Sequence, residues 1–326
     1  MLNCMLNFLE WNGAEDFSSN EPLSKAIELI KGKNFIEAIT LSESVMESEN
    51  FRSKALALQG SVQFIKGDMN SAFETLTLSS QLNPKDSDVL IKLALVELER
   101  NNYLKMHENL DLAQEVNPDN PALYYHRGEI FALAGNLELA IKDFEKAIDL
   151  YPKFVLAYVH KARALLGLGQ VYEAEEVLFK AQDKFKDSLE VSNSLGEVLV
   201  MKKDFEAAEK VFNGILKKHP KSPEVYLNKA LLAMTRNEDV KAAEKHLKRA
   251  IEIEPSFEAA HLQLANLLLS NGNVNDSMIH FEHAVKYART LQELISVHSL
   301  KCASVAQLKI AEQFPSLVDK MKYFNQ

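Results

Sequence analysis

The 326-residue sequence contains few glycines and prolines, 11 and 9, and this scarcity disfavours folds built from many tight turns. Cysteine is also scarce. Cys4 and Cys302 are too few and too far apart for a disulfide framework or a cysteine metal site, so we expect a reducing intracellular compartment. Basic residues do not outnumber acidic ones, and the net charge is −9. This charge argues against a nucleic-acid-binding protein and favours basic partners through electrostatic steering.

Long apolar runs are absent. No run approaches eighteen residues, and the opening stretch, MLNCMLNFLEWNG, has no basic region ahead of its apolar residues. The apolar fraction of 47% and the charged fraction of 25% are ordinary for a globular protein. From the sequence alone we therefore expect a soluble cytosolic chain without a transmembrane segment.

Motifs that carry catalysis or bind cofactors are missing as well. The phosphate-binding loop, the HExxH zinc motif and the GxSxG elbow do not occur. GLGQVY at 167–172 has two glycines but no third and follows no strand, so we interpret it as a turn. His280 and His283 lie three residues apart, but no third metal ligand has suitable spacing, and we interpret them as a surface pair. We expect no enzymatic activity, no cofactor and no metal site.

What the sequence does contain is a repeat. Pro84, Pro118 and Pro152 are 34 residues apart, Pro220 follows 68 residues later, and Pro255 follows after 35 more. A 34-residue period is typical of tetratricopeptide repeats, each of which is one helix–turn–helix unit.

Small residues recur in the same frame. Glycine or alanine stands 24 positions before four of the prolines, at Gly60, Ala94, Gly128 and Gly196. Alanine stands 12 positions before four of them, at Ala72, Ala140, Ala208 and Ala243. A bulky residue follows the second position or its equivalent, at Phe144, Phe212, Leu247 and Phe281. Helices cross closely only where side chains are small, and the bulky residue fills the space beside the crossing.

We therefore predict an all-α fold, a right-handed tetratricopeptide-repeat solenoid of about eight repeats with a C-terminal capping helix. The predicted segments are an N-terminal segment at 1–18, repeats at 19–52, 53–86, 87–120, 121–154, 155–188, 189–222, 223–257 and 258–291, a capping helix at 292–312 and a tail at 313–326.

In this architecture the first helix of each repeat lines the groove, and its positions 2, 5, 9 and 12 share one face, which we call the inner face. The candidate peptide-binding residues on or beside this face are Tyr125, His126, Glu129, Val159, Arg163, Asn193, Glu197, Leu227, Leu231 and Leu262. Apolar members would hold a hydrophobic segment and charged members would orient it. The alternative for any single residue is that it packs against a neighbouring helix.

One tetratricopeptide binding mode can be tested in this frame. Repeats that hold the acidic C-terminal tail of a heat-shock chaperone share a carboxylate clamp of lysine, asparagine and arginine side chains. The corresponding positions in the first three repeats are Leu23, Ile27, Leu58, Asp88 and Lys92. We therefore expect that this chain does not bind chaperone tails.

Two stretches resemble a known receptor family. FEHAVKYARTLQELISVHSLKCASVAQLKI, residues 281–310, resembles the closing repeat and final helix of the seventy-kilodalton receptor of the mitochondrial outer-membrane import machinery. NPDNPALYYHRGEIFALAGNLELAIKDFEKAIDLYP, residues 117–152, resembles a central repeat of that receptor. The resemblance covers residues 20–312 and corresponds to the middle and C-terminal repeats of the family.

The resemblance implies a non-enzymatic import receptor that binds mitochondrial precursor proteins, above all hydrophobic carriers, in the groove. It places the chain at the cytosolic face of the mitochondrial outer membrane and makes other import-complex subunits further candidate partners. The membrane anchor and the chaperone clamp of the family have no counterpart in this sequence. The alternative is a general tetratricopeptide scaffold or adaptor in an unrelated multiprotein complex.

Overall fold

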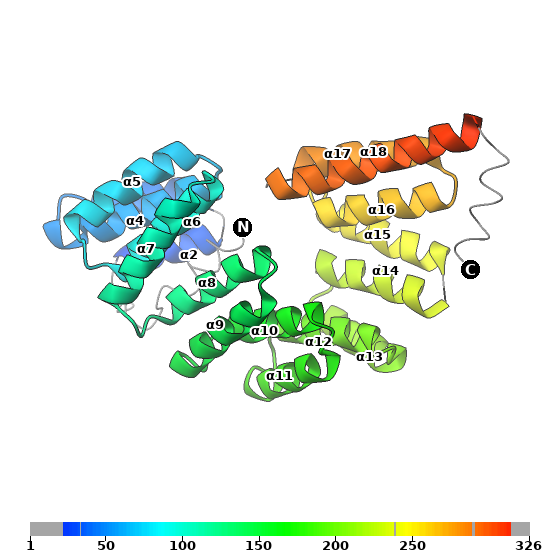
Figure 1. Cartoon of the computed structure of the whole chain (residues 1–326), viewed down its shortest axis with the longest axis horizontal. Helices are drawn as coiled ribbons and strands as arrows, with labels where there is room; N and C mark the ends of the chain where they lie inside the picture. The colour runs from blue at the N-terminus through cyan, green and yellow to red at the C-terminus, as the bar shows by residue number, and fades with distance from the viewer. Residues whose placement is uncertain (1–21, 33, 238, 289–290, 314–326) are drawn as a thin grey trace. The chain divides into compact units, whose positions relative to one another are not determined.

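The computed structural model describes residues 22–32, 34–237, 239–288 and 291–313 (Figure 1). These residues form seventeen helices, and none of them lies in a strand. The predicted all-α class is confirmed. The predicted N-terminal segment at 1–18, with Cys4, and the predicted tail beyond Gln313 lie outside the described residues.

The helices follow one another at short intervals along the chain. Their bounds are α2 Pro22–Lys31, α3 Phe35–Ser44, α4 Glu49–Ile65, α5 Met69–Leu82, α6 Ser87–Glu99, α7 Tyr103–Val116, α8 Pro121–Leu133, α9 Leu137–Leu150, α10 Val155–Gly167, α11 Val171–Lys184, α12 Leu189–Met201, α13 Phe205–Lys218, α14 Pro223–Asn237, α15 Val240–Ile253, α16 Glu258–Ser270, α17 Val274–Tyr287 and α18 Leu291–Gln313. An even-numbered helix contacts the helix after it in the pairs α2–α3, α4–α5, α6–α7, α8–α9, α10–α11, α14–α15 and α16–α17. In α12–α13, Gly196 lies against Phe212. The division into eight repeats with the boundaries given above stays a prediction.

The turn inside six of these pairs contains one residue with positive φ, two positions before the second helix. These residues are Gly67, Asn101, Gly135, Gly169, Lys203 and Gly272, with φ between 59° and 83°. Glycine adopts this left-handed conformation at little cost, whereas a side chain such as that of Lys203 is strained there. The turn therefore has the same geometry even where its sequence is not the favoured one.

The first turns of several helices are capped by polar side chains. The Asp204 carboxylate accepts from the Ala207 N–H at 3.2 Å, and the Asp239 carboxylate accepts from the Ala242 N–H at 3.0 Å. Each cap satisfies a backbone donor that has no partner within its helix. Asp68, Asp86, Asn102 and Asn120 cap other helices in the same way.

Paired helices cross at the small residues that the sequence spacing predicted. A Cβ atom added to Gly128 would lie 2.8 Å from Phe144 Cε1, and one added to Gly196 would lie 2.3 Å from Phe212 Cε1. Both phenylalanines are almost completely buried. The aromatic ring occupies the space that a larger residue on the first helix would need.

The chain divides into two compact units, one ending at Val191 and the other beginning at Ser192. In the first unit, apolar side chains of α2 to α8 form one core and those of α8 to α10 continue it around Tyr125 and Phe144. In the second unit, one core lies between α14, α15 and α16. A smaller core joins Phe281 of α17 to Val297 of α18.

Candidate functional site

In the first unit, α8 carries three of the predicted binding residues, and they are bonded to one another. The Tyr125 hydroxyl donates to Glu129 Oε1 at 3.0 Å, and His126 Nδ1 lies 2.9 Å from Glu129 Oε2. The Tyr125 ring packs 4.6 Å, centroid to centroid, from the Phe154 ring. Tyr125 and His126 have no exposed surface. These two side chains bond to the Glu129 carboxylate, and they present no surface of their own to a ligand.

Helix α10 extends this polar cluster. His160 Nδ1 lies 3.5 Å from Glu129 Oε1, and the His160 side chain is largely buried. Burial lowers the pKa of His160, Arg163 lowers it further, and the Glu129 charge opposes both effects. Val159 is buried in the same helix, whereas Arg163 is exposed. Of the five predicted residues in this unit, only Arg163 projects a side chain into solvent.

The positions compared with the chaperone clamp also lie in this unit. Leu23, Ile27 and Leu58 are buried among apolar side chains. Lys92 is only 3% exposed, and burial lowers its pKa and raises that of Asp88, whose carboxylate accepts from the Asn120 amide at 2.7 Å. The absence of chaperone-tail binding stays a prediction.

In the second unit, α12 and α14 are joined by an amide network. Asn228 Nδ2 donates to Asn193 Oδ1 at 3.0 Å and to Glu197 Oε1 at 2.8 Å. Asn193 Nδ2 donates to the same Glu197 oxygen at 3.2 Å. Both asparagines are buried. The structure therefore brings together Asn193 and Glu197, which were predicted, with Asn228, which is not among the predicted residues.

The three predicted leucines of the second unit differ in exposure. Leu231 of α14 is 40% exposed. Leu227 of α14 is half-buried against the core of α14, α15 and α16, and Leu262 of α16 packs against the core that contains Phe281. Only Leu231 offers a large apolar surface to a ligand.

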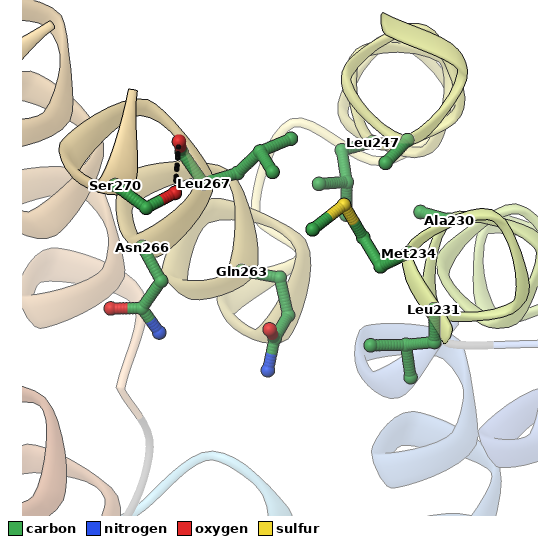
Figure 2. A pocket seen from close by; sticks show the side chains of 9 residues that line it. Ala230, Leu231, Met234, Leu247, Gln263, Asn266, Leu267 and Ser270 are labelled. Carbon is green, nitrogen blue, oxygen red and sulfur yellow. Dashed lines mark hydrogen bonds between the residues drawn. The ribbon is translucent and has the colours of Figure 1, made fainter. Parts of the chain in front are cut away.

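Leu231 lines a pocket of about 250 Å³ between α14, α15 and α16 (Figure 2). Its lining residues are Ala230, Leu231, Met234, Ala243, Leu247, Gln263, Asn266, Leu267 and Ser270. Met234 and Leu247 point into the space between the helices, and Leu231 lies at its edge. Six of the nine residues are apolar, so the pocket suits an apolar side chain.

The polar edge of the pocket comes from α16. Gln263 and Asn266 lie one helical turn apart, and their amides point to the same side of the helix (Figure 2). The Ser270 hydroxyl is already engaged, because it donates to the Leu267 carbonyl at 2.9 Å. An amide carries both donors and an acceptor, so this edge can bond the backbone of an extended segment whose side chain fills the pocket.

Sequence reasoning placed Met234 and Asn266 on the inner face but did not select them, and it missed Gln263. Gln263 stands at position 6 of its helix, outside the 2, 5, 9, 12 pattern. The four lining residues of α16, Gln263, Asn266, Leu267 and Ser270, have the i, i+3, i+4, i+7 spacing of one helical face, which is rotated from the face that the 2, 5, 9, 12 pattern marks. Helix periodicity alone does not say which face borders the pocket, because the pocket forms between three helices.

Two further expectations concern absences. Among the residues that the structure describes, no three His, Cys, Asp or Glu side chains are placed to hold a metal ion. Within the same described ranges, no helix has the length and apolar character needed to cross a membrane.

Three segments, 121–154, 160–223 and 234–296, match family models described as tetratricopeptide repeat. The chain therefore contains tetratricopeptide repeats in these segments. The predicted all-α solenoid is confirmed by these matches together with the helices of the structure.

The sequence is similar to mitochondrial import receptor subunits named TOM70. It is 23% identical to the subunit of Rattus norvegicus over 313 residues, which are 92% of this chain and 51% of the relative. It is 27% identical to that of Saccharomyces cerevisiae over 305 residues, which are 89% of this chain and 49% of the relative. The predicted resemblance is confirmed, and the chain spans about half the length of the curated relatives it matches.

A solved structure shows the same fold. The crystal structure of yeast Tom70 matches with a TM-score of 0.68 at 24% identity, covering 98% of this chain and 72% of that one. At this identity the match establishes the architecture.

Proposed function

We propose that the chain is a non-enzymatic receptor that binds mitochondrial precursor proteins through hydrophobic, carrier-type segments. The observation that carries the proposal is the pocket between α14, α15 and α16, an apolar cavity with two amides at its edge, in a chain similar to import receptor subunits along most of its length. Through that resemblance we place its work at the cytosolic face of the mitochondrial outer membrane, together with other import subunits.

In this proposal the second unit does the binding. Leu231, Met234 and Leu247 hold one apolar side chain of the precursor, while Gln263 and Asn266 bond the backbone on either side of it. Burial of one large apolar side chain contributes about 1.5–3 kcal/mol, so a single pocket supplies modest affinity and tolerates many sequences. Such tolerance suits a receptor for diverse precursors.

The remaining predicted residues have supporting roles. The bonds among Asn193, Glu197 and Asn228 fix α12 against α14 and so orient the helix that carries Leu231. In the first unit, Glu129 and Arg163 supply charges of both signs, while Tyr125, His126 and Val159 pack beneath them. Leu227 and Leu262 stabilise the helices on either side of the pocket.

The decisive experiment measures fluorescence anisotropy of a labelled internal hydrophobic segment from a mitochondrial carrier. Leu231→Asp places a charge at the pocket edge and should weaken binding at least about tenfold, which corresponds to about 1.4 kcal/mol. Ile279→Asp is the matched control, because Ile279 is 52% exposed on α17 of the same unit and does not line the pocket. Circular dichroism should show unchanged helical content in both variants.

The outcomes separate the alternatives. Equal binding by the Leu231→Asp and Ile279→Asp variants would show that the pocket is not the site. Failure of the unmodified protein to bind the carrier segment would favour the scaffold function. A labelled acidic chaperone tail, tested beside the carrier segment, should not bind.

A further inference from the structure

The fourth residue of several first helices makes the same bond. In α8, α10 and α14 it is a tyrosine whose hydroxyl donates to the carbonyl of the proline six residues earlier. The pairs are Tyr124 with Pro118 at 2.8 Å, Tyr158 with Pro152 at 3.2 Å and Tyr226 with Pro220 at 3.5 Å. In α16 the fourth residue is His261, and its Nε2 lies 3.0 Å from the Pro255 carbonyl oxygen. A histidine therefore does in this repeat what a tyrosine does in the others.

The bond to Pro255 determines where the proton of His261 lies. A carbonyl oxygen only accepts, so Nε2 of His261 carries a proton and donates it. In the neutral ring Nδ1 is then an acceptor. His280 Nδ1 of α17 lies 3.0 Å from this Nδ1, so His280 must donate. The contact between α16 and α17 thus has one arrangement of protons.

Protonation of both rings destroys that arrangement. When only one ring is charged, the neutral ring can keep its proton on Nε2 and accept at Nδ1, whereas two charged imidazoles would point the Nδ1–H of His261 at the Nδ1–H of His280. His261 is only 3% exposed, and its ring stacks on the His283 ring with 4.9 Å between the centroids. Water therefore has little access to replace the lost bond.

These contacts also correct the sequence interpretation of His280 and His283 as a plain surface pair, because both rings pack against His261.

The charged neighbours do not offset this penalty. Asp276 faces His280 and favours its charged form, but Lys248 of α15 and the other histidines act against it. On the far side of α17, Glu282 pairs with Lys301 of α18 at 3.7 Å, and the neutral Tyr287 ring lies 5.8 Å from the His261 ring. Burial, followed by the neighbouring histidines, lowers the pKa of His280. Burial also lowers the pKa of His261, and the bond to Pro255 opposes this shift.

We propose that the packing of α16 on α17 does not tolerate charge on both His261 and His280, so that mild acid selectively loosens this helix pair. Because α16 carries Gln263, Asn266, Leu267 and Ser270, the same acidification opens one wall of the pocket. The loosening of the helices stands on the histidine geometry alone. The consequence for ligand binding rests on the proposed function.

The direction of the effect follows from linkage. A histidine whose pKa is lowered by folding stabilises the folded state above its ordinary pKa of about 6.5. That stability is lost as the pH falls below this value toward the folded pKa, by up to about tenfold in the unfolding equilibrium per pH unit for each group. His160 and His246 also have lowered pKa values, so the whole chain responds to acid and the test must be local.

The test is amide hydrogen exchange on the full chain at about pH 7.5 and 5.5, on either side of the ordinary histidine pKa. After correction for intrinsic exchange rates, protection of α16 and α17 should fall by about tenfold more than protection of α4 and α5, which contain no histidine. His261→Tyr is the matched variant, because tyrosine makes the equivalent bond at Tyr226 without titrating in this range. In this variant the excess loss should disappear.

A second variant covers the case in which the tyrosine does not fit. His280→Gln places an amide opposite His261, and an amide can donate to neutral His261 or accept from its charged form. In this variant too, the extra loss of exchange protection in α16 and α17 should be smaller. The proposal is overturned if the unmodified protein loses no more protection in α16–α17 than in α4–α5, or if both variants keep the excess loss.

Binding of the labelled carrier segment at the two pH values gives the second readout. The unmodified protein should bind about tenfold more weakly in acid, and the His261→Tyr variant should not. If the segment fails to bind at any pH, the proposed function is wrong while the exchange result still decides the histidine proposal.

Discussion

Asn228 of α14 donates through Nδ2 to Asn193 Oδ1 of α12 at 3.0 Å, although 35 residues separate them along the chain. Glu197 accepts from both amides through one oxygen. The two helices are thus joined at the inner face by a buried polar network, in which each member depends on the others for a partner.

Asn228→Ala should therefore destabilise the second unit. The substitution leaves the Asn193 oxygen without its donor and removes a bond from Glu197, at a cost of about 1–3 kcal/mol. Urea unfolding measures the change. Lys229→Ala, at the next residue, removes only an exposed bond to Asn213 and should change stability by less than about 0.5 kcal/mol. Equal effects of the two substitutions would contradict the role of the network.

Gly196→Ala should destabilise the crossing of α12 and α13. Its Cβ would lie 2.3 Å from the Phe212 ring, and overpacking of this kind costs about 1–3 kcal/mol. Gly214 of α13 is the control, since a Cβ there meets nothing within 4 Å. Gly214→Ala should stabilise the protein by about 0.5–1 kcal/mol through helix propensity. A thermal melt that moved in the same direction for both variants would rule out the crossing argument.

Lys203→Gly should stabilise the turn between α12 and α13. Lys203 has φ of 62°, where a side chain costs about 1–2 kcal/mol and glycine does not, although glycine loses more backbone entropy. We expect a net gain of about 0.5–1 kcal/mol in denaturant unfolding. The reverse change at the equivalent turn position, Gly169→Ala with φ of 76°, should destabilise. Loss of stability in Lys203→Gly would mean that the lysine side chain contributes more than its strain costs.

His160 should titrate below the ordinary histidine pKa of about 6.5, because burial disfavours its charged form. Glu129→Gln removes the charge that raises the pKa of His160 and should lower it further, whereas Arg163→Gln should raise it. NMR titration of the ring measures both. Since folding lowers this pKa, His160 stabilises the first unit above about pH 6.5, and that contribution is lost as the pH falls. Shifts of the same sign in the two variants would contradict this account.

The all-α fold and its helix crossings could be predicted from the sequence because both depend on residues close together along the chain. Gly128 and Phe144 meet within one helix pair, and their spacing is set by helix rise and turn length. The 34-residue proline period reports the same local geometry. Helix periodicity likewise assigned Leu231 and Asn266 to one face of their helices.

The candidate site was predictable only in part. Periodicity marks a face but does not distinguish a surface from an interface between repeats, so it selected the buried Tyr125 together with the exposed Leu231. Gln263 lies outside the periodic pattern, and it reaches the pocket because α16 packs beside α14 and α15.

What the sequence by itself determined is the helix–turn–helix repeat, because hydrophobic period, small residues and turn residues act over a few tens of positions. Only the tertiary structure decided which polar groups meet between helices: Asn228 with Asn193 across two repeats, and His261 with His280 within one. Such pairs depend on how one helix is rotated and shifted against the next. A change of one residue in that register would separate them and leave every local pattern in the sequence unchanged.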